Sequence, residues 1–183
     1  VEIEPSPLTQ MEYETLRDAM PTMRDQLVCR VLRGTGWRIG EVLACQVRHM
    51  AFNGPEVALY LTRSKKRTPD LQKKYEQVPL PPGRGVLLRD HVRYLGLRPE
   101  QPIFKVSKRQ VERVFVATGQ RVLGRGVHPH QLRKLYATFL IDNGVPAPVV
   151  AHYLGHSDYR ITEKWYYEGN VDKLAEIQRR VPA

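Results

Sequence analysis

A single short stretch of alternating residues, 56–62, interrupts a chain whose apolar residues otherwise follow helical spacing. The stretch is rich in β-forming residues and follows the turn sequence Asn53-Gly54-Pro55, so we expect a strand there. A partner strand is predicted over 76–80, where prolines end it. Two strands joined by a hairpin make only a small antiparallel sheet. The sequence therefore predicts a mainly helical α+β fold.

Helical periodicity predicts the other elements. A capping box over 9–12 opens a first helix, and a second helix begins near Met23 and ends at Gly34-Thr35-Gly36. A short helix over 38–45 precedes the hairpin, and further helices are expected at 107–123, 130–141, 147–154, 157–167 and 171–179. The sequence contains no internal repeat and no interior linker, so we expect one domain over residues 1–183.

The charge balance favours a polyanionic partner. Lys and Arg total 29 against 19 Asp and Glu, which gives a formal net charge of +10. Such an excess is typical of nucleic-acid-binding proteins, although some basic proteins have no such partner. No apolar run is long enough to cross a membrane, and Cys29 and Cys45 lie among apolar residues, as buried thiols do. We therefore expect a cytoplasmic protein that does not associate with membranes.

Several residues of the C-terminal half could carry phosphate chemistry. His130 and Arg133 lie three residues apart on one face of a predicted helix, and Lys134 joins them. An imidazole beside a guanidinium can hold a phosphate oxygen while it moves a proton. His156 lies in a tight turn between two predicted helices, and Tyr166 follows ten residues later. Each feature taken alone also fits an ordinary helix face or a hydrophobic core.

Taken together, these residues resemble the tyrosine recombinase, or phage integrase, family. The likeness rests on Arg38 in the run Gly-Thr-Gly-Trp-Arg-Ile-Gly-Glu-Val-Leu, then on His130-Gln131-Leu132-Arg133, Leu154-Gly155-His156 and Tyr166, in that order. It covers nearly the whole chain. The resemblance implies the catalytic-domain fold of that family. It also implies a site-specific recombinase that cleaves and rejoins double-stranded DNA through a 3′-phosphotyrosine.

The resemblance implies a role for each matching residue. Arg38 and Arg133 would hold the non-bridging oxygens of the scissile phosphate. His130 would assist proton transfer, and His156 would contact the same phosphate. Glu41 matches an acidic position that supports the arginines. Fixed cations suit this reaction because phosphodiester exchange places negative charge on the equatorial oxygens.

The nucleophile and the general acid each have a rival. Tyr166 would attack the phosphorus, but the commonest family spacing falls on Trp165, and Tyr167 follows directly. A lysine on the hairpin would protonate the leaving 5′ oxygen. Lys65 is our choice, and Lys66 is a close rival because this hairpin is longer than the usual form.

Other basic side chains are expected to bind the DNA backbone. They lie on the hairpin and at the start of the helix over 107–123, and they are Arg63, Lys66, Arg67, Lys73, Lys74, Lys108 and Arg109. Lys134 stands where many relatives have a second histidine, and it keeps the charge.

The ends of the chain bear on its assembly. Full-length family members carry an N-terminal core-binding domain, whereas about eight residues precede the first predicted helix here, so we expect the C-terminal domain of a longer integrase. The last segment has an apolar stripe at Val171, Leu174 and Ile177. In the family such a tail docks on a neighbouring protomer, which predicts a homotetramer on DNA. Alternatively, it packs on its own domain in an isolated monomer.

Exchange of phosphodiesters needs neither ATP nor a metal, so we expect no cofactor.

Three competing functions stay open. A metal-dependent nuclease would use His128, His130, His152 and His156, but Gly155 breaks the helix and no glutamate follows His152 as a base. A non-catalytic DNA-binding module of the same fold is the second competing function, and a type IB topoisomerase is the third.

Overall fold

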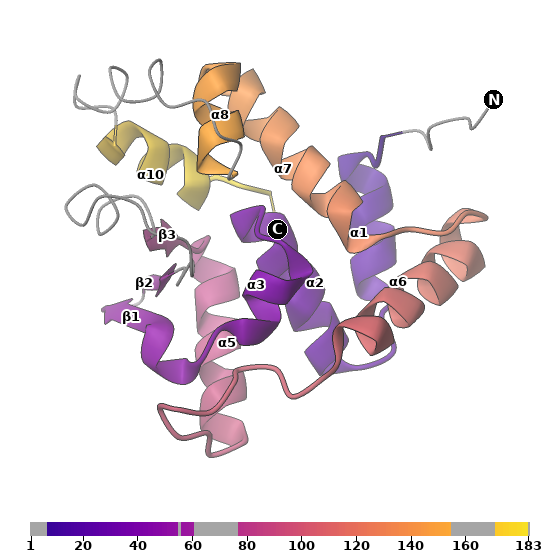
Figure 1. The fold of residues 1–183 in the computed structure, drawn as a ribbon, viewed down its shortest axis with the longest axis horizontal. Coiled ribbons are helices and arrows are strands. Elements are labelled where there is room, and N and C mark those ends of the chain that lie inside the picture. Colours follow the sequence, from indigo (N-terminus) through magenta and orange to yellow (C-terminus); the bar gives the residue numbers. More distant parts are fainter. Residues whose placement is uncertain (1–6, 55, 61–76, 155–170, 183) are drawn as a thin grey trace.

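The computed structural model describes residues 7–54, 56–60, 77–154 and 171–182, shown in colour in Figure 1. Their helices are α1 (Gln10–Asp18), α2 (Met23–Thr35), α3 (Ile39–Ala44), α5 (Pro82–Tyr94), α6 (Lys108–Leu123), α7 (Pro129–Asp142), α8 (Ala147–Tyr153) and α10 (Val171–Arg179), with a 3-10 turn at Val47–His49. The strands are β1 (Met50–Asn53), β2 (Glu56–Tyr60) and β3 (Gln77–Pro79). The predicted mainly helical α+β fold is confirmed, and the helix expected over 157–167 lies outside the described residues.

The sheet contains one strand more than the sequence predicted. Its order is β1-β2-β3, and both pairings are antiparallel. Tyr60 at the end of β2 is opposite Gln77 at the start of β3, as the predicted hairpin requires. Pro79 fits because β3 is an outer strand of the described sheet, where a missing amide donor is tolerated. The missed strand β1 has only four residues and ends at the turn residue Asn53.

Helix α2 lies at the centre of the helical part (Figure 1). It contacts α7, α5, α1 and α3, and α5 in turn packs on β2. Hydroxyl groups set three helix starts: Thr9, Thr22 and Ser107 each accept a hydrogen bond from the backbone amide three residues later, at 3.1–3.2 Å. These caps explain why α1, α2 and α6 begin where the sequence predicted.

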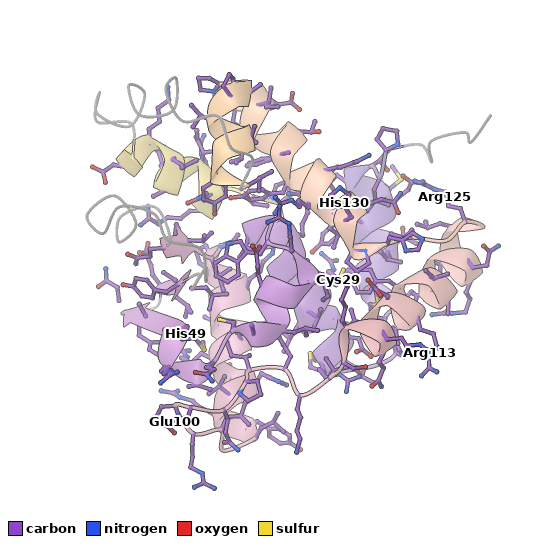
Figure 2. All side chains as sticks on the ribbon, in the orientation of Figure 1. Cys29, His49, Glu100, Arg113, Arg125 and His130 are labelled. Carbon is purple, nitrogen blue, oxygen red and sulfur yellow. The ribbon has the colours of Figure 1, made fainter. Side chains whose placement is uncertain are left out.

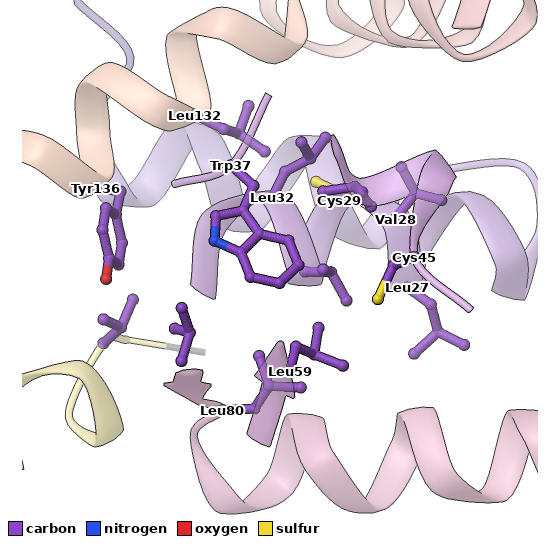
Figure 3. Packing of buried hydrophobic residues seen from close by; sticks show 14 of the residues in the cluster. Leu27, Val28, Cys29, Leu32, Trp37, Cys45, Leu59, Leu80, Leu132 and Tyr136 are labelled. Atoms are coloured by element: carbon purple, nitrogen blue, oxygen red, sulfur yellow. The ribbon is translucent and has the colours of Figure 1, made fainter. Parts of the chain in front are cut away.

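The core joins the sheet to the helices around Trp37 (Figure 3). Trp37 is 2% exposed, and it lies between Leu132 of α7 and the sheet-side residues Leu59 and Leu80. Cys29 and Cys45 are free and buried, as predicted. Burial raises the pKa of both thiols to about 12, so neither is an anion at neutral pH.

Helix α10 packs against its own domain. It contacts β3, and Leu174 and Ile177 are buried in the core. The Nε atom of Arg179 lies 3.3 Å from Oε1 of Glu56, the first residue of β2. None of the described helices is both long and apolar enough to span a membrane.

Candidate active site

The turn between α2 and α3 positions Arg38. Gly36 ends α2 with a φ of 65°, the left-handed conformation that glycine adopts most easily. A Cβ atom at this position would overlap Cδ1 of Tyr136, so the close approach of α7 also requires glycine. Trp37 then turns into the core, and Arg38 follows as the exposed N-cap residue of α3. The buried side chain of Trp37 therefore immediately precedes the exposed guanidinium of Arg38.

Glu41 fixes the orientation of Arg38. Its Oε2 accepts a 2.8 Å hydrogen bond from the backbone amide of Arg38, and its Oε1 lies 3.3 Å from Nη1 of the guanidinium. The Arg38 side chain remains 51% exposed, whereas that of Glu41 is 19% exposed. The carboxylate therefore restricts the arginine without covering it. This arrangement is what the expected supporting role of Glu41 needs.

Arg133 is buried, at 4% exposure, on helix α7. Its Nη1 donates a 2.8 Å hydrogen bond to the carbonyl of Gly36, and its Nη2 donates to the carbonyl of Leu154. Gly36 lies two residues before Arg38, and Leu154 directly follows α8. One guanidinium therefore ties α7 to both turns. The helical spacing of the sequence did not predict this burial.

His130 and Lys134 lie on the exposed side of α7. His130 is on the first turn of the helix (Figure 2), and Lys134 follows one turn later. The backbone amide of His128, the N-cap residue, donates a 2.8 Å hydrogen bond to Oε1 of Gln131. The first turn of α7 has no acidic residue, so the positive end of the helix dipole is not offset there. His130 therefore lies in surroundings that favour an anion.

The structure thus gathers part of the predicted site at one junction. Arg133 binds the carbonyl two residues before Arg38, and His130 lies one helical turn before Arg133. The exposed Arg38, the anchored Arg133 and the supporting Glu41 therefore belong to the place where α7 contacts the α2–α3 turn. The two backbone carbonyls that receive Arg133 were missed by sequence reasoning. Gly36 carried a signal in the Gly-Thr-Gly run, but Leu154 carried none.

Of the remaining predicted residues, two lie on helix α6, and the others lie outside the residues that the structure describes. Lys108 and Arg109 are exposed on the first turn of α6, where Nζ of Lys108 lies 3.6 Å from Oε1 of Glu112. Helix α6 contacts α3 and α1. The residues that lie outside the described ranges are Arg63, Lys65, Lys66, Arg67, Lys73, Lys74, His156, Tyr166 and Tyr167.

The metal-site alternative finds no support in the described ranges. Among those residues no three His, Cys, Asp or Glu side chains are grouped so that they could hold a metal ion. His128 and His130 are both exposed on either side of Pro129. His156, which that alternative also needs, lies outside the described residues.

Comparison with known proteins identifies relatives along almost the whole chain. The profile of the phage integrase family matches residues 7–173. A tyrosine recombinase from Pseudothermotoga lettingae is 27% identical over 169 residues, which cover 90% of this chain and 56% of that protein. The tyrosine recombinase XerA from Pyrococcus furiosus is 27% identical over 172 residues, which cover 87% of this chain and 56% of that protein.

A solved structure has the same fold. The integrase from mycobacterium phage Brujita superimposes with a TM-score of 0.69 at 17% sequence identity, over 100% of this chain and 60% of that one. The described domain is therefore of a kind found within a longer protein in each of these three cases, since the chain spans 56–60% of their length.

Proposed function

Because this chain belongs to the phage integrase family, we propose that it is the catalytic domain of a tyrosine recombinase. In this proposal it cleaves and rejoins double-stranded DNA site-specifically through a 3′-phosphotyrosine, without a metal or ATP. The observation that carries the proposal is the junction of α7 with the α2–α3 turn. There one arginine is anchored, a second is exposed and oriented, and a histidine stands at a helix N-terminus.

The two arginines would share the scissile phosphate unequally. Arg38 is half exposed and oriented by Glu41, so it would make the main contact with a non-bridging oxygen. Arg133 is held by two carbonyls, so its guanidinium cannot turn and would offer only its accessible edge. Groups that are fixed before the reaction need no reorganisation as charge develops, and this makes them effective in catalysis.

Proton transfer and attack would use the other predicted residues. His130 would assist proton transfer from its position on the first turn of α7, with Lys134 adding positive charge one turn later. His156 would contact the same phosphate, and Lys65, with Lys66 as rival, would protonate the leaving 5′ oxygen. Tyr166, with Tyr167 as rival, would be the nucleophile.

DNA would be bound by basic residues of α6 and of the β2–β3 connection. The expected contacts to phosphates are those of Lys108 and Arg109 on α6 and of Arg63, Lys66, Arg67, Lys73 and Lys74 on the β2–β3 connection. The XerH site-specific recombinase bound to its difH substrate superimposes with a TM-score of 0.67 at 17% identity, over 94% of this chain and 53% of that one. That likeness extends the proposal to a DNA partner.

The assembly would change on DNA. Because α10 packs on its own domain, the isolated chain would be a monomer, and a homotetramer would form only on recombination sites. The chain would be the C-terminal catalytic domain of a longer integrase. Its two buried thiols fit the reducing cytoplasm.

Covalent trapping tests the function. The chain, Tyr166→Phe and Tyr167→Phe would be incubated with nicked suicide duplexes in EDTA, and protein–DNA adducts that survive SDS would be measured. We expect an adduct that only Tyr166→Phe abolishes; loss only in Tyr167→Phe would move the nucleophile by one residue. No adduct with any duplex, alongside measurable DNA binding, would leave a binding module of the same fold. Relaxation of plasmid without joining of two duplexes would indicate a topoisomerase.

A further inference from the structure

Two further arginines are buried completely inside the helical part of the molecule. Arg33 on α2 is 1% exposed, and Arg84 on α5 is 2% exposed. Removing a guanidinium from water is strongly unfavourable unless hydrogen bonds and an opposite charge replace the water. Arginine is accordingly almost never fully buried without a partner. The contacts of these two side chains show which of their N–H donors have a hydrogen-bond partner and which do not.

Arg33 is only partly satisfied. Its Nε and Nη2 donate to Oε1 of Gln10 at 3.3 and 3.0 Å, and its guanidinium lies 5.9 Å from the ring centre of Tyr13 and 5.6 Å from that of Phe139. These contacts are with neutral groups. The Nη1 atom is buried and has no hydrogen-bond partner.

Arg84, like Arg33, has buried N–H donors without a hydrogen-bond partner. Its Nη2 donates to the carbonyl of Pro182, just after α10, while Nε and Nη1 are buried without a hydrogen-bond partner. A Cβ atom at Gly34 would lie 2.8 Å from Nη1 of Arg84, so this guanidinium lies directly on α2, on the residue next to Arg33. The absence of a side chain at Gly34 makes that approach possible.

No carboxylate among the described residues pairs with either charge. Burial raises the pKa of Tyr13, and it raises the pKa of Tyr136 and of Cys29 to about 12, so these neighbours stay neutral at pH 7. Burial, and then the charge of Arg84, lowers the pKa of Arg33 only to about 10, so Arg33 stays charged.

We infer that Arg33 and Arg84 form an internal binding site for one small inorganic anion, between α2, α5 and the segment that follows α10. The guanidinium donors that have no hydrogen-bond partner would bind it, together with the buried hydroxyl of Tyr13, which lies beside Arg84. Planar guanidinium forks match the oxygens of phosphate or sulfate, and chloride can accept the same donors. The inference does not depend on the proposed recombinase activity.

An anion in this site would link three parts of the chain. Arg33 belongs to α2, Arg84 to α5, and Arg84 also holds the carbonyl of Pro182. An ion that binds the folded chain and not the unfolded chain raises the unfolding temperature in proportion to the logarithm of its concentration once the site is nearly saturated. The site therefore predicts saturable stabilisation by millimolar anion.

Thermal unfolding of the whole chain tests this prediction. Sodium phosphate, sulfate and chloride would be added separately, at constant ionic strength kept with gluconate, and at concentrations too low for general salt effects. We expect a rise in Tm of about 5–10 °C at roughly 100 times the Kd of the preferred anion. The order of the three Kd values distinguishes an oxyanion site from a halide site.

Three variants locate the bound anion. Arg33→Met/Arg84→Met removes the site, and Arg93→Met/Arg98→Met removes the same charge from exposed positions. Arg38→Gln removes the guanidinium of the candidate active site, which would itself attract phosphate. We expect the rise in Tm to disappear only in the first variant. A rise that persists there, or no saturable rise in the unmodified chain with any of the three anions, would overturn the inference.

A crystallographic measurement covers the case in which the methionine variant does not fold. Crystals of the unmodified chain would be soaked separately in selenate and in bromide, and anomalous density would be calculated. We expect a peak within hydrogen-bonding distance of both Arg33 and Arg84 for at least one of the two ions. Peaks that occur only at surface cations would contradict the site.

Discussion

Two pairs of arginines in this molecule differ in what meets their positive charge. At the junction of α7 with the α2–α3 turn, Arg133 donates to two backbone carbonyls and Arg38 is oriented by Glu41 while it remains half exposed. In the interior, Arg33 and Arg84 are at least as deeply buried as Arg133, yet three of their nitrogen atoms have no hydrogen-bond partner.

The difference teaches how to separate structural arginines from binding arginines. A buried guanidinium whose donors end on carbonyls is part of the fold, because removing it leaves those carbonyls without a partner. A guanidinium held at one edge and open at the other is prepared for a ligand. Arg38 is of the second kind. Arg133 combines the two, because its two carbonyl contacts belong to the fold while its remaining edge is the one proposed to meet the phosphate. The interior pair combines full burial with open donors, which is why an anion is inferred there.

The largest effect is expected from Arg133→Ala. The carbonyls of Gly36 and Leu154 would both lose their donor, at about 1–3 kcal/mol each, so the free energy of unfolding should fall by about 2–6 kcal/mol. Urea denaturation followed by circular dichroism measures this loss. Arg133→Lys, which can reach only one carbonyl at a time, serves as the control and should recover part of it. A change below about 0.5 kcal/mol, as at ordinary surface positions, would remove Arg133 from the structural class.

Arg38→Ala should separate function from stability. The side chain is 51% exposed, so the free energy of unfolding should change by less than about 0.5 kcal/mol. Loss of a fixed charge at the phosphate should lower the rate of single-turnover cleavage by about two to three orders of magnitude, or about 3–4 kcal/mol. Wild-type cleavage by the variant would show that Arg38 is an ordinary surface residue.

The interior pair should behave in the opposite way to Arg133. Without added phosphate, sulfate or chloride, Arg33→Met/Arg84→Met should unfold with a free energy equal to that of the unmodified chain or higher by about 1–4 kcal/mol, because well-packed apolar side chains often replace buried charges at no loss. Urea denaturation of both chains in the same gluconate buffer measures the difference. A loss as large as that of Arg133→Ala would mean that residues of the chain already satisfy the pair.

The smallest effect is expected at a partly exposed arginine with a carboxylate partner. Arg125 Nη2 lies 2.8 Å from Oε1 of Glu12, and the backbone amide of Thr9, then Arg125, lowers the pKa of Glu12 although burial opposes it. Glu12→Gln keeps the cap and loses the charge, so it should cost about 0.5–1 kcal/mol at pH 7.

The pH dependence of this effect has a defined sign. Because the folded-state pKa of Glu12 is lowered, its stabilisation is complete above the ordinary glutamate pKa and is lost as the pH falls through the lowered value. The difference in unfolding free energy between the chain and Glu12→Gln should therefore shrink as the pH is lowered below that of unfolded glutamate. A difference that is constant between neutral and strongly acidic pH would assign it to packing.

Sequence periodicity predicted most of the fold because helices bury regular stripes. In the helix expected over 107–123, Val111, Phe115 and Thr118 are buried at helical spacing, and Thr9, Thr22 and Ser107 cap the helices that follow them. Strand β1 was missed because four residues are too few to establish alternation. Its place in the sheet comes from pairing with β2 and not from its own pattern.

The candidate site was predictable by residue type but not by environment. The order of Arg38, the His130–Arg133 pair, the Leu154-Gly155-His156 motif and Tyr166 carried the resemblance to the family, yet it could not distinguish an exposed arginine from a buried one. Burial of Arg133 depends on carbonyls from two distant turns, and burial of Arg84 depends on the bare backbone of Gly34. Such contacts arise only when separate helices pack together.

Identification of the covalently attached residue tests the central claim most directly. The SDS-stable adduct would be digested with protease and nuclease, and the peptide that carries the nucleotide would be sequenced by mass spectrometry. The account predicts a nucleotide joined through its 3′ phosphate to Tyr166, with a free 5′ hydroxyl on the other DNA end. Cleaved DNA with free 3′ hydroxyl and 5′ phosphate ends, no linked peptide and a requirement for a divalent metal would contradict it and indicate a nuclease.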